Sequence, residues 1–354
     1  MAVTLEELGG WPAVIGRLMR MESLTSVQAS AALSDILEGN ATSAQIAAFA
    51  VGLRMKGETV EEMTGMVTAM LDHAERVDLP AGVAVESLID TCGTGGDRSH
   101  SINVSTIGAF VAAGAGARVC KHGNRAASSA AGSADVLEAL GVVIDLGPSG
   151  VGRCVAEAGM GFCFAPRYHA ASRHAVPTRR ELGVPTVFNF LGPLANPARP
   201  LRQVVGVSDA AMAEKVVGVL SANGARRAMV VYGHDGLDEL TTTDTSTVLS
   251  LEEDGSVRTF VVDPVSLGLP KASLDVLRGG DPVTNAGLAR RVLDGEKGPH
   301  RDIVLLNAAA AVVVAGLAPD LVDGLELAAD SVDSGRAAGV LERLVEVSKD
   351  AAQG

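Results

Sequence analysis

The stretch "DTCGTGGDRSHSINVST", residues 90–106, joins a run typical of a strand, "VESLI", to a run typical of a helix, "IGAFVAAGAGA". A turn alone needs one or two glycines, whereas Gly93, Gly95 and Gly96 come together here and lead into Asp97. In parallel α/β proteins, ligands bind where strands end and helices begin. Glycines let the backbone approach a phosphate closely, and helix N-termini favour anions. The junction therefore predicts either a phosphate-binding loop or no more than a tight strand-to-helix turn.

Two common nucleotide-binding motifs are excluded at this junction. A dinucleotide-binding fingerprint requires glycine where Arg98 stands, and a P-loop ends in Gly-Lys followed by Ser or Thr. This loop instead ends in Gly-Gly-Asp, so a phosphorylated ligand of another kind is indicated.

Beyond this junction, short β-branched runs alternate with helical segments. The expected strands are "SLID", "ARVCK", "GVVIDLG", "GFCFAP", "RQVVGVS" and "RAMVVYG". Such alternation predicts an α/β fold with a mainly parallel central sheet. Residues 246–263 break the pattern with a hairpin that turns at Asp254-Gly255, and residues 303–317 return to helix.

The first eighty residues predict helices only. Residues 23–39, 42–57 and 59–77 begin at hydroxyl side chains, and the first two end at glycine. Thr59 with Glu62 three residues later forms a capping box. We therefore expect a small N-terminal helical bundle domain over 1–80, joined by part of 166–197, and a larger α/β domain over 81–354.

Composition excludes several classes of partner. The 354 residues carry a formal net charge of −13 and only 3% aromatic residues, which argues against binding nucleic acid or an anionic membrane. The longest apolar run, "AAAAVVVAGLA", is too short to span a bilayer. Four scattered cysteines indicate reduced thiols and, with no signal peptide recognisable at the start, a cytoplasmic protein.

A second glycine-containing loop strengthens the phosphate-binding hypothesis. The segment "CKHGNRAASSAAGSADVLEALG" follows an expected strand and offers Lys121, His122, Asn124 and Arg125 together with three serines. A solvated basic turn is the alternative, but a lysine beside small residues suits a phosphate as a point charge.

Two further segments carry charged side chains suited to a ligand. Asp238 and Glu239 are adjacent in "YGHDGLDELTTT"; they are either solvated or, beside a polyphosphate, able to hold Mg²⁺. Arg179 and Arg180 precede a Pro-punctuated apolar segment, where a partly buried arginine could bind a substrate carboxylate. Spacing does not determine which of the two arginines faces inward.

Together, "GTGGD", "NVST", "KHGNRAASS", "GSADVLEALG", "RRELG", "FNFLGPLANP" and "GLDEL" closely resemble the anthranilate phosphoribosyltransferase family. The resemblance covers essentially the whole chain. It implies Mg²⁺-dependent transfer of a 5-phosphoribosyl group from phosphoribosyl pyrophosphate (PRPP) to the amine of anthranilate, in tryptophan biosynthesis. It also implies a homodimer formed through the helical domain, with the active site at the hinge.

The resemblance assigns residues to each ligand. Contacts with Mg²⁺ are implied for Ser105, Asp238 and Glu239, and contacts with anthranilate for Gly93, His122, Asn124 and Arg179. Contacts with PRPP are implied for a larger set, drawn from both glycine loops: Gly93, Gly96, Asp97, Ser101, Asn103, Val104, Ser105, Thr106, Lys121, His122, Gly123, Asn124, Arg125, Ala126, Ala127, Ser128, Ser129 and Ser133.

Ala170, Ser172 and Pro185 depart from the residues usual in this family, and Arg98 and His100 stand in a loop whose residues are usually smaller. The first three bear on the expected shape of the channel for the aromatic acid, and the last two on the mobility of the PRPP loop. A pyrimidine-nucleoside phosphorylase of related architecture is a rival, but "KHGNRAASS" fits that group poorly. A non-catalytic nucleic-acid-binding paralogue is opposed by the net charge of −13 and by the retained acidic pair.

Overall fold

Seven strands form one sheet in the order β3-β2-β1-β4-β5-β6-β7 in the computed structural model, which describes residues 3–97, 99–126 and 130–353. The first five strands pair in parallel, and β6 and β7 extend the sheet as an antiparallel hairpin. The strands are β1 (Leu88–Gly93), β2 (Arg118–Gly123), β3 (Met160–Phe164), β4 (Arg202–Gly206), β5 (Arg227–Gly233), β6 (Ser246–Leu251) and β7 (Val257–Val262). The prediction of a mainly parallel sheet is confirmed, and so is the hairpin turn, where Gly255 has φ +83°.

One expected strand is wrong. Residues 141–147 form no strand, although Val142, Ile144 and Leu146 are buried in alternation as a strand would bury them. The backbone N–H of Val142 instead donates to Leu137 at the end of a helix, and that of Val143 donates to the Ser348 hydroxyl. These partners satisfy the backbone N–H groups of Val142 and Val143 without a neighbouring strand.

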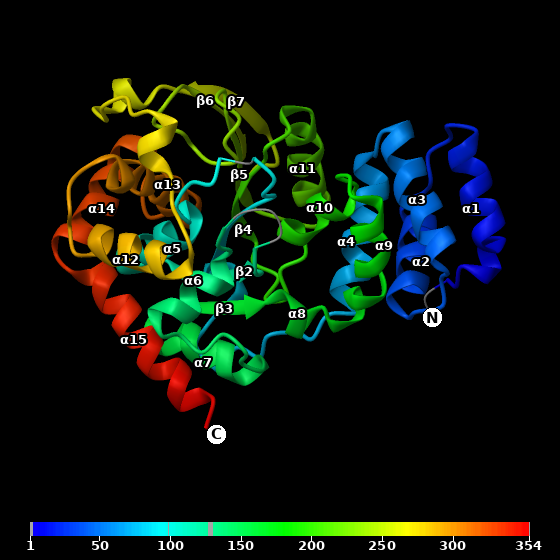
Figure 1. The fold of residues 1–354 in the computed structure, drawn as a ribbon, viewed down its shortest axis with the longest axis horizontal. Helices are drawn as coiled ribbons and strands as arrows, with labels where there is room; N and C mark the ends of the chain where they lie inside the picture. The colour runs from blue at the N-terminus through cyan, green and yellow to red at the C-terminus, as the bar shows by residue number, and fades with distance from the viewer. Residues whose placement is uncertain (1–2, 98, 127–129, 354) are drawn as a thin grey trace.

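The N-terminal lobe is a bundle of four helices: α1 (Gly10–Met19), α2 (Ser26–Leu37), α3 (Ser43–Lys56) and α4 (Val60–Asp72), preceded by the 3₁₀ turn η1 (Glu6–Leu8). The side chains of Thr25, Thr42 and Thr59 each accept a hydrogen bond from the backbone N–H three residues on. The Gln or Glu side chain at that position accepts one in return from the backbone N–H of the threonine. These capping boxes fix where the helices begin because they satisfy N–H groups that a helix cannot pair internally. Figure 1 shows the bundle beside the sheet-containing lobe.

Most of the remaining helices share one core with the sheet. They are α5 (Val104–Gly114), α6 (Ser133–Leu140), α7 (Pro148–Ala158), α12 (Pro282–Leu293), α13 (Pro299–Ala315), α14 (Leu321–Asp333) and α15 (Arg336–Ala351). Helices α5, α7, α13 and α15 contact the strands, and α6, α12 and α14 pack on other helices of this set. Helix α11 (Ala210–Ala222) packs on β5 and β6 and also on α4 of the bundle. The 3₁₀ turns here are η2 (Val85–Ser87), η5 (Pro264–Leu267) and η6 (Leu274–Leu277).

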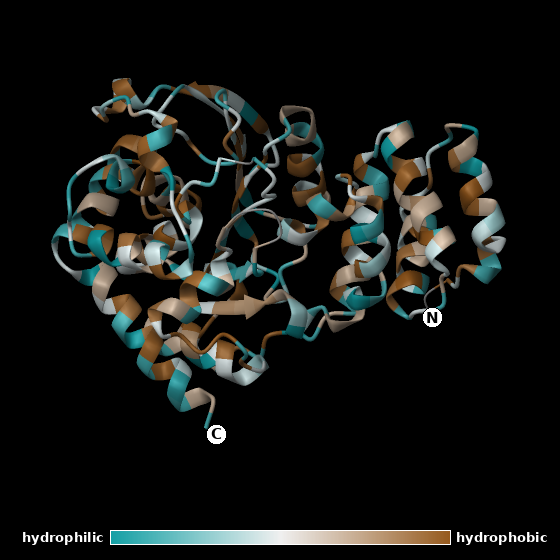
Figure 2. Cartoon of the chain, in the orientation of Figure 1, coloured by the Kyte–Doolittle hydropathy of each residue, from teal (hydrophilic) through white to brown (hydrophobic). Residues whose placement is uncertain are grey.

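Alternating side chains of the strands divide the apolar core in two. Val204 and Val231 pack with α5 and α13, whereas Val205 and Val230 pack with α11 and the bundle. Figure 2 shows apolar residues on the inner sides of both lobes. The bundle therefore shares its core with one face of the sheet, and this shared core sets the orientation of the two lobes.

The segment after β3 runs beside the bundle before the chain returns to the sheet at β4. It contains α8 (Ala165–Tyr168), η3 (Ala170–His174), α9 (Val176–Leu182), α10 (Phe188–Leu191) and η4 (Gly192–Leu194). Contacts join α9 to α3, η3 to α2 and α10 to α4. Among the described residues, no helix combines the length and the apolarity needed to cross a bilayer.

Candidate active site

Three parallel strands end in glycine at the same edge of the sheet. Gly93 ends β1, Gly123 ends β2 and Gly206 ends β4, and Gly93 is paired with Gly206. Carboxyl ends of parallel strands share one edge, so the loops that follow them are neighbours. The Asn103 side chain donates to the carbonyl of Ala131 at 3.0 Å, which joins the first glycine loop to the second.

The acidic segment lies directly on this glycine edge. A Cβ atom added at Gly206 would overlap the carbonyl group of Asp238, and one added at Gly93 would overlap the Asp238 carboxylate. The backbone N–H of Gly95 donates to that carboxylate at 2.7 Å, and the N–H of Ser105 donates to Glu239 at 3.2 Å. The two glycine loops and the acidic pair thus meet at one place.

The carboxylates of the acidic segment are crowded and buried. Burial, followed by the charge of Asp97, raises the pKa of Asp238 from 3.8 to about 7. Burial, followed by the charge of Asp238, raises the pKa of Glu239 well above its ordinary value. Like charges held this close favour either protons or a cation, although by accessible surface only Asp238 is buried and Asp97 and Glu239 are partly exposed.

The donor set suits Mg²⁺ that is shared with a phosphorylated ligand. In the part of the chain that the structure describes, no group of three or more Asp, Glu, His or Cys side chains is placed to bind a metal by itself. Mg²⁺ needs no such group, because it commonly takes one or two carboxylates and completes its shell with phosphate oxygens and water.

Lys121 supplies the positive charge inside the site. Its side chain is only 1% exposed, and its ammonium group donates to the carbonyl of Thr91 and to the hydroxyl of Ser105. The same charge lowers the pKa of Glu239 and of Asp90 against the larger effect of burial. A buried lysine next to the glycine loops can therefore neutralise part of an anionic ligand.

A cavity of about 260 Å³ lies between this edge and the helical bundle. Its walls come from α2 and α4 on one side and from the second glycine loop and the α8–η4 segment on the other. They are formed by Leu33, Leu37, Met70, His122, Asn124, Ala165, Pro166, His169, Ala170, Ser172, Arg173, Ala175, Val176, Arg179, Phe188 and Gly192. The apolar wall suits a flat ring, and the few polar groups can orient it.

Arg179 is the partly buried cation of this cavity. Its guanidinium lies 5.4 Å from the centre of the Phe188 ring, and burial lowers its pKa. Among the described residues, no carboxylate contributes to its electrostatic environment. A half-buried arginine with a stacked ring and no anion is poised to bind a carboxylate of a ligand. The neighbouring Arg180 is exposed and lies outside the cavity wall.

The tautomer of His122 follows from its hydrogen bonds. Its Nδ1 lies 3.0 Å from the carbonyl oxygen of Gly192 and must donate to it, which leaves the Nε2 lone pair with no partner in the described structure. Burial, followed by the proximity of His169, lowers the pKa of His122 from 6.5 to about 3. The imidazole is therefore neutral where it forms part of the cavity wall.

Several predicted residues are held by the protein itself. Arg125 pairs with Asp135 and Glu138 and lies 5.5 Å from the Phe164 ring centre. The side-chain oxygen of Asn103 accepts from the side-chain amide of Asn285 at 2.9 Å.

The other predicted positions of the second glycine loop are residues 126–129. Ala127, Ser128 and Ser129 lie outside the described residues, whereas Ala126 donates its N–H to Asp135. Of the departures from the family pattern, Ala170 and Ser172 line the cavity, whereas Pro185 and His100 do not; Arg98 lies outside the described residues.

Sequence reasoning missed part of the cavity wall. His169, Phe188 and three bundle residues, Leu33, Leu37 and Met70, line it without having been singled out. His169 could have been found, because it follows a strand end in "GFCFAPRYH"; its ring centre lies 5.1 Å from that of His122. The bundle residues gave no signal, since an apolar helix face is equally typical of a core.

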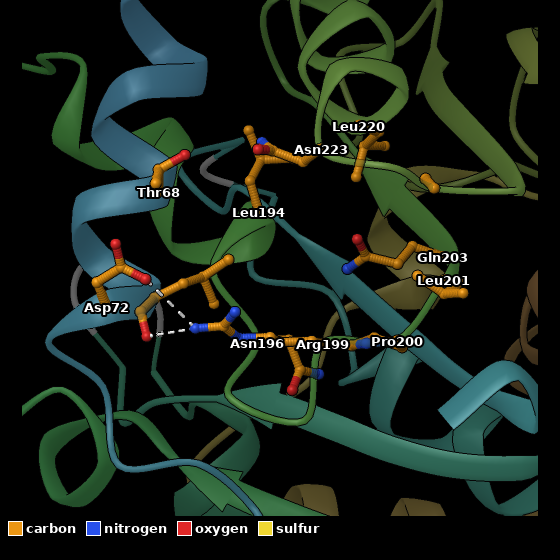
Figure 3. Close-up of a pocket in the computed structure, with 12 residues that line it drawn as sticks. Thr68, Asp72, Leu194, Asn196, Arg199, Pro200, Leu201, Gln203, Leu220 and Asn223 are labelled. Carbon is orange, nitrogen blue, oxygen red and sulfur yellow. Dashed lines mark hydrogen bonds and ion pairs between the residues drawn. The ribbon is translucent and has the colours of Figure 1, made fainter. Parts of the chain in front are cut away.

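A separate cavity of about 260 Å³ lies near the start of β4, the opposite end of that strand from Gly206 (Figure 3). Arg199 there donates to the carbonyl of Leu71 at 2.9 Å and faces Asp72 at 3.6 Å, which ties the linker before β4 to α4. None of the predicted site residues lines this cavity.

Comparisons with known proteins agree with this architecture. The model of the glycosyl transferase family helical bundle domain matches residues 12–74, and that of the family's a/b domain matches residues 85–338. The chain is 52% identical over 343 residues to anthranilate phosphoribosyltransferase of Salinispora arenicola, covering 96% of each protein.

Two solved structures of proteins with the same name are also similar. For the enzyme from Thermus thermophilus the TM-score is 0.89 at 40% identity, over 95% of this chain and 99% of that one. For the Saccharomyces cerevisiae enzyme in complex with PRPP and Mg, the TM-score is 0.87 at 28% identity, over 96% and 98% of the two chains.

Proposed function

We infer that this chain, which belongs to the family of anthranilate phosphoribosyltransferases, catalyses the Mg²⁺-dependent transfer of the 5-phosphoribosyl group from PRPP to the amine of anthranilate. The products are N-(5-phosphoribosyl)anthranilate and pyrophosphate, and the reaction belongs to tryptophan biosynthesis. One observation carries the inference: a cavity with an anion-free arginine is lined by the second glycine loop, which is joined to the first glycine loop and the acidic pair beside it.

The glycine loops and the acidic segment form the proposed PRPP site. In this proposal PRPP binds residues 121–129 and Ser133 of the second loop, together with eight residues of the first loop. The first-loop residues are Gly93, Gly96, Asp97, Ser101, Asn103, Val104, Ser105 and Thr106. Lys121 supports this assignment because its buried charge needs an anion nearby, and Ser105 because it opens α5, whose N-terminus favours negative charge. The paired side chains of Asn103 and Arg125 support a role in holding the loops together as well as in binding.

Ser105, Asp238 and Glu239 hold the Mg²⁺ ion in this proposal. The raised pKa values of the two carboxylates support it, since a bound cation offsets the repulsion that raises them. When bound, Mg²⁺ neutralises charge that grows on pyrophosphate as it leaves.

Anthranilate occupies the cavity beside the bundle, against His122, Asn124 and Arg179, which line it. Gly93, the fourth proposed contact, does not line the cavity and lies instead against Asp238. The Arg179 guanidinium binds the carboxylate, and the neutral imidazole of His122 forms part of the wall that orients the ring.

Because an aryl amine is a weak nucleophile, the departure of pyrophosphate accounts for much of the activation barrier. Lys121 and the loop N–H groups stabilise the charge that departure creates, and the cavity holds the amine in position.

The direct test is a fluorescence assay. Anthranilate fluorescence should decline when the chain is mixed with PRPP and Mg²⁺, and it should stay constant when Mg²⁺ is omitted. Fluorescence that stays constant in the complete mixture, with folded protein, would exclude the function.

The glycine edge gives a prediction about Asp238. Gly206→Ala places a Cβ atom where the Asp238 carbonyl group lies, so the acidic segment must move. We expect kcat to fall about 10²-fold, the cost of displacing a reacting group by about 1 Å. Gly287→Ala is the matched control, because that helical glycine has open space around it. Steady-state kinetics over a range of Mg²⁺ concentrations would measure kcat for both variants. A kcat of Gly206→Ala equal to that of the wild type and of Gly287→Ala would contradict the prediction.

We also propose a division into a helical domain, residues 1–80 with part of 166–197, and an α/β domain, residues 81–354. The packing of α9, η3 and α10 on the bundle supports this division. A cytoplasmic location is supported by four buried cysteines with no disulfide among the described residues.

A homodimer formed through the helical domain is the proposed assembly. Met19, Met21 and Met55 are 79%, 56% and 74% exposed, at the ends of α1 and α3. Leu18 packs against Gly52 between these helices, so the methionines extend one apolar surface. Light scattering on the purified chain should return twice the 36.0 kDa mass of one copy; a single-chain mass would refute the dimer.

A further inference from the structure

One polar side chain stands in an otherwise apolar stretch of α13. Residues 303–314 of this helix read "IVLLNAAAAVVV", every one of them is buried, and Asn307 is the only one with a polar side chain. The helix packs on α5 and contacts β1, β4 and β5. Burying an amide in such surroundings is unfavourable unless its hydrogen bonds are made, so the partners of Asn307 indicate what it does there.

Asn307 binds both polar groups of one backbone residue. Its Oδ1 accepts from the N–H of Leu240 at 2.9 Å, and its Nδ2 donates to the carbonyl of Leu240 at 2.8 Å and to that of Ile303 at 2.9 Å. The Leu240 backbone makes no other hydrogen bond in the described structure. The amide of Asn307 thus takes the place of a neighbouring strand and fixes Leu240 at both its donor and its acceptor.

Leu240 directly follows Glu239, one of the proposed metal ligands. The Leu240 N–H and the Glu239 carbonyl belong to one planar peptide unit, so fixing Leu240 also fixes the backbone from which the Glu239 side chain extends. The Glu239 carboxylate in turn accepts from the N–H of Ser105 at 3.2 Å. The residues Asn307, Glu239 and Ser105 also line one small cavity, of about 10 Å³.

The same turn of α13 supports Ser105. Gly108 lies one turn after Ser105 in α5 and faces the backbone of α13. A Cβ atom added at Gly108 would lie 3.6 Å from the backbone nitrogen of Ala308 and 3.8 Å from the carbonyl oxygen of Val304. Residues on either side of Asn307 therefore set the position of α5. Two of the three proposed Mg²⁺ ligands thus depend on one turn of α13.

We propose that Asn307 is a positioning residue for the Mg²⁺ site: it holds the Leu240 backbone so that the Glu239 carboxylate faces Ser105. This role rests on the function proposed above, and Asn307 itself touches neither substrate nor metal. Groups that orient metal-binding side chains contribute roughly 10–100-fold to metal affinity without contacting the ion. Loss of Asn307 should therefore weaken the binding of Mg²⁺ and leave that of anthranilate unchanged.

The experiment compares the full chain with Asn307→Leu, which keeps about the size of the side chain and removes its amide. Binding of Mg²⁺ at saturating pyrophosphate is followed by calorimetry, with the heat of Mg²⁺ and pyrophosphate alone subtracted. We expect the dissociation constant of Mg²⁺ to rise about tenfold or more in the variant. In steady-state kinetics the Mg²⁺ concentration at half-maximal rate should rise by the same factor, while the KM for anthranilate stays unchanged.

Ser348→Ala is the matched control. Ser348 is a fully buried residue of α15 whose hydroxyl accepts from the N–H of Val143 in an irregular segment, so this variant loses a bond of the same kind far from the acidic pair. Its Mg²⁺ dissociation constant should match that of the wild type. Hydrogen exchange of the unliganded proteins gives a second readout. The Leu240 amide should exchange faster only in Asn307→Leu, and the Val143 amide only in Ser348→Ala.

An unchanged Mg²⁺ dissociation constant in Asn307→Leu, or a rise of the same size in Ser348→Ala, would overturn the positioning role. A wild type that binds no Mg²⁺ with pyrophosphate would exclude the proposed function, and the positioning role with it. If Asn307→Leu does not fold, Asn307→Ser decides the matter. Its single, shorter hydroxyl cannot replace both bonds to Leu240, so the dissociation constant of Mg²⁺ should rise there too.

Discussion

Replacing Arg179 by alanine is expected to raise the anthranilate KM by at least about 30-fold, with little change in the KM for PRPP. The guanidinium has no anion among the described residues and is partly buried in the cavity wall. Losing one partner of a buried charge pair costs about 2–5 kcal/mol, equivalent to a factor of roughly 30 to several thousand in affinity. Steady-state kinetics with each substrate varied in turn would measure the effect.

Arg180→Ala is the control for this prediction. It removes the same charge from the adjacent residue, which is exposed and lies outside the cavity wall, so its kinetics should match the wild type. Thermal unfolding separates binding from folding: Arg179 has no ion pair to lose, so its loss should leave the unliganded protein as stable as before. An unchanged anthranilate KM in Arg179→Ala would remove this residue from the site.

The second large effect is expected from Asp238→Asn combined with Glu239→Gln. Turnover should fall about 10³-fold or more and lose its dependence on Mg²⁺, because a metal ion contributes several kcal/mol of charge stabilisation in such a reaction. The two side chains keep their shape and lose their charge. Single-turnover measurements over a range of Mg²⁺ concentrations would test this, and normal turnover would refute the metal assignment.

The same variant should be more stable than the wild type when no metal is present. A carboxylate whose pKa is raised by folding is stabilising only while it is protonated, so its contribution is lost as pH rises through the folded-state pKa. For Asp238 that loss runs from about pH 4 to about pH 7. The amides do not titrate, so the stability advantage of the variant should grow over this range, by at most about 1.4 kcal/mol per pH unit for each group.

Denaturant unfolding at several pH values would measure this difference, with Asp275→Asn as a control at an exposed aspartate. The double variant should gain nothing from added Mg²⁺ and pyrophosphate, whereas the wild type should be stabilised by them. A stability difference that does not change with pH would contradict the raised pKa values of the buried pair.

Local patterns were sufficient for the parts of this molecule that depend on short-range forces. The capping box at Thr59 predicted a helix start, because its bonds join residues three apart. The glycines of residues 90–106 predicted the strand-to-helix junction. The failure at residues 141–147 has the opposite cause, since alternating burial is visible in a sequence but the pairing partner is not.

The sequence alone determined the class of fold, the phosphate-binding character of the two glycine loops and the presence of an acidic pair. Only the tertiary structure decided which arginine faces inward, since Arg179 and Arg180 differ in nothing but the side of α9 on which they lie. It alone brought Leu33, Leu37 and Met70 of the bundle to the cavity wall, and it alone paired Asn307 with the segment that carries the acidic pair. The physical reason is the same in each case: burial and pairing depend on every element packed around a side chain, and neighbours along the chain do not specify them.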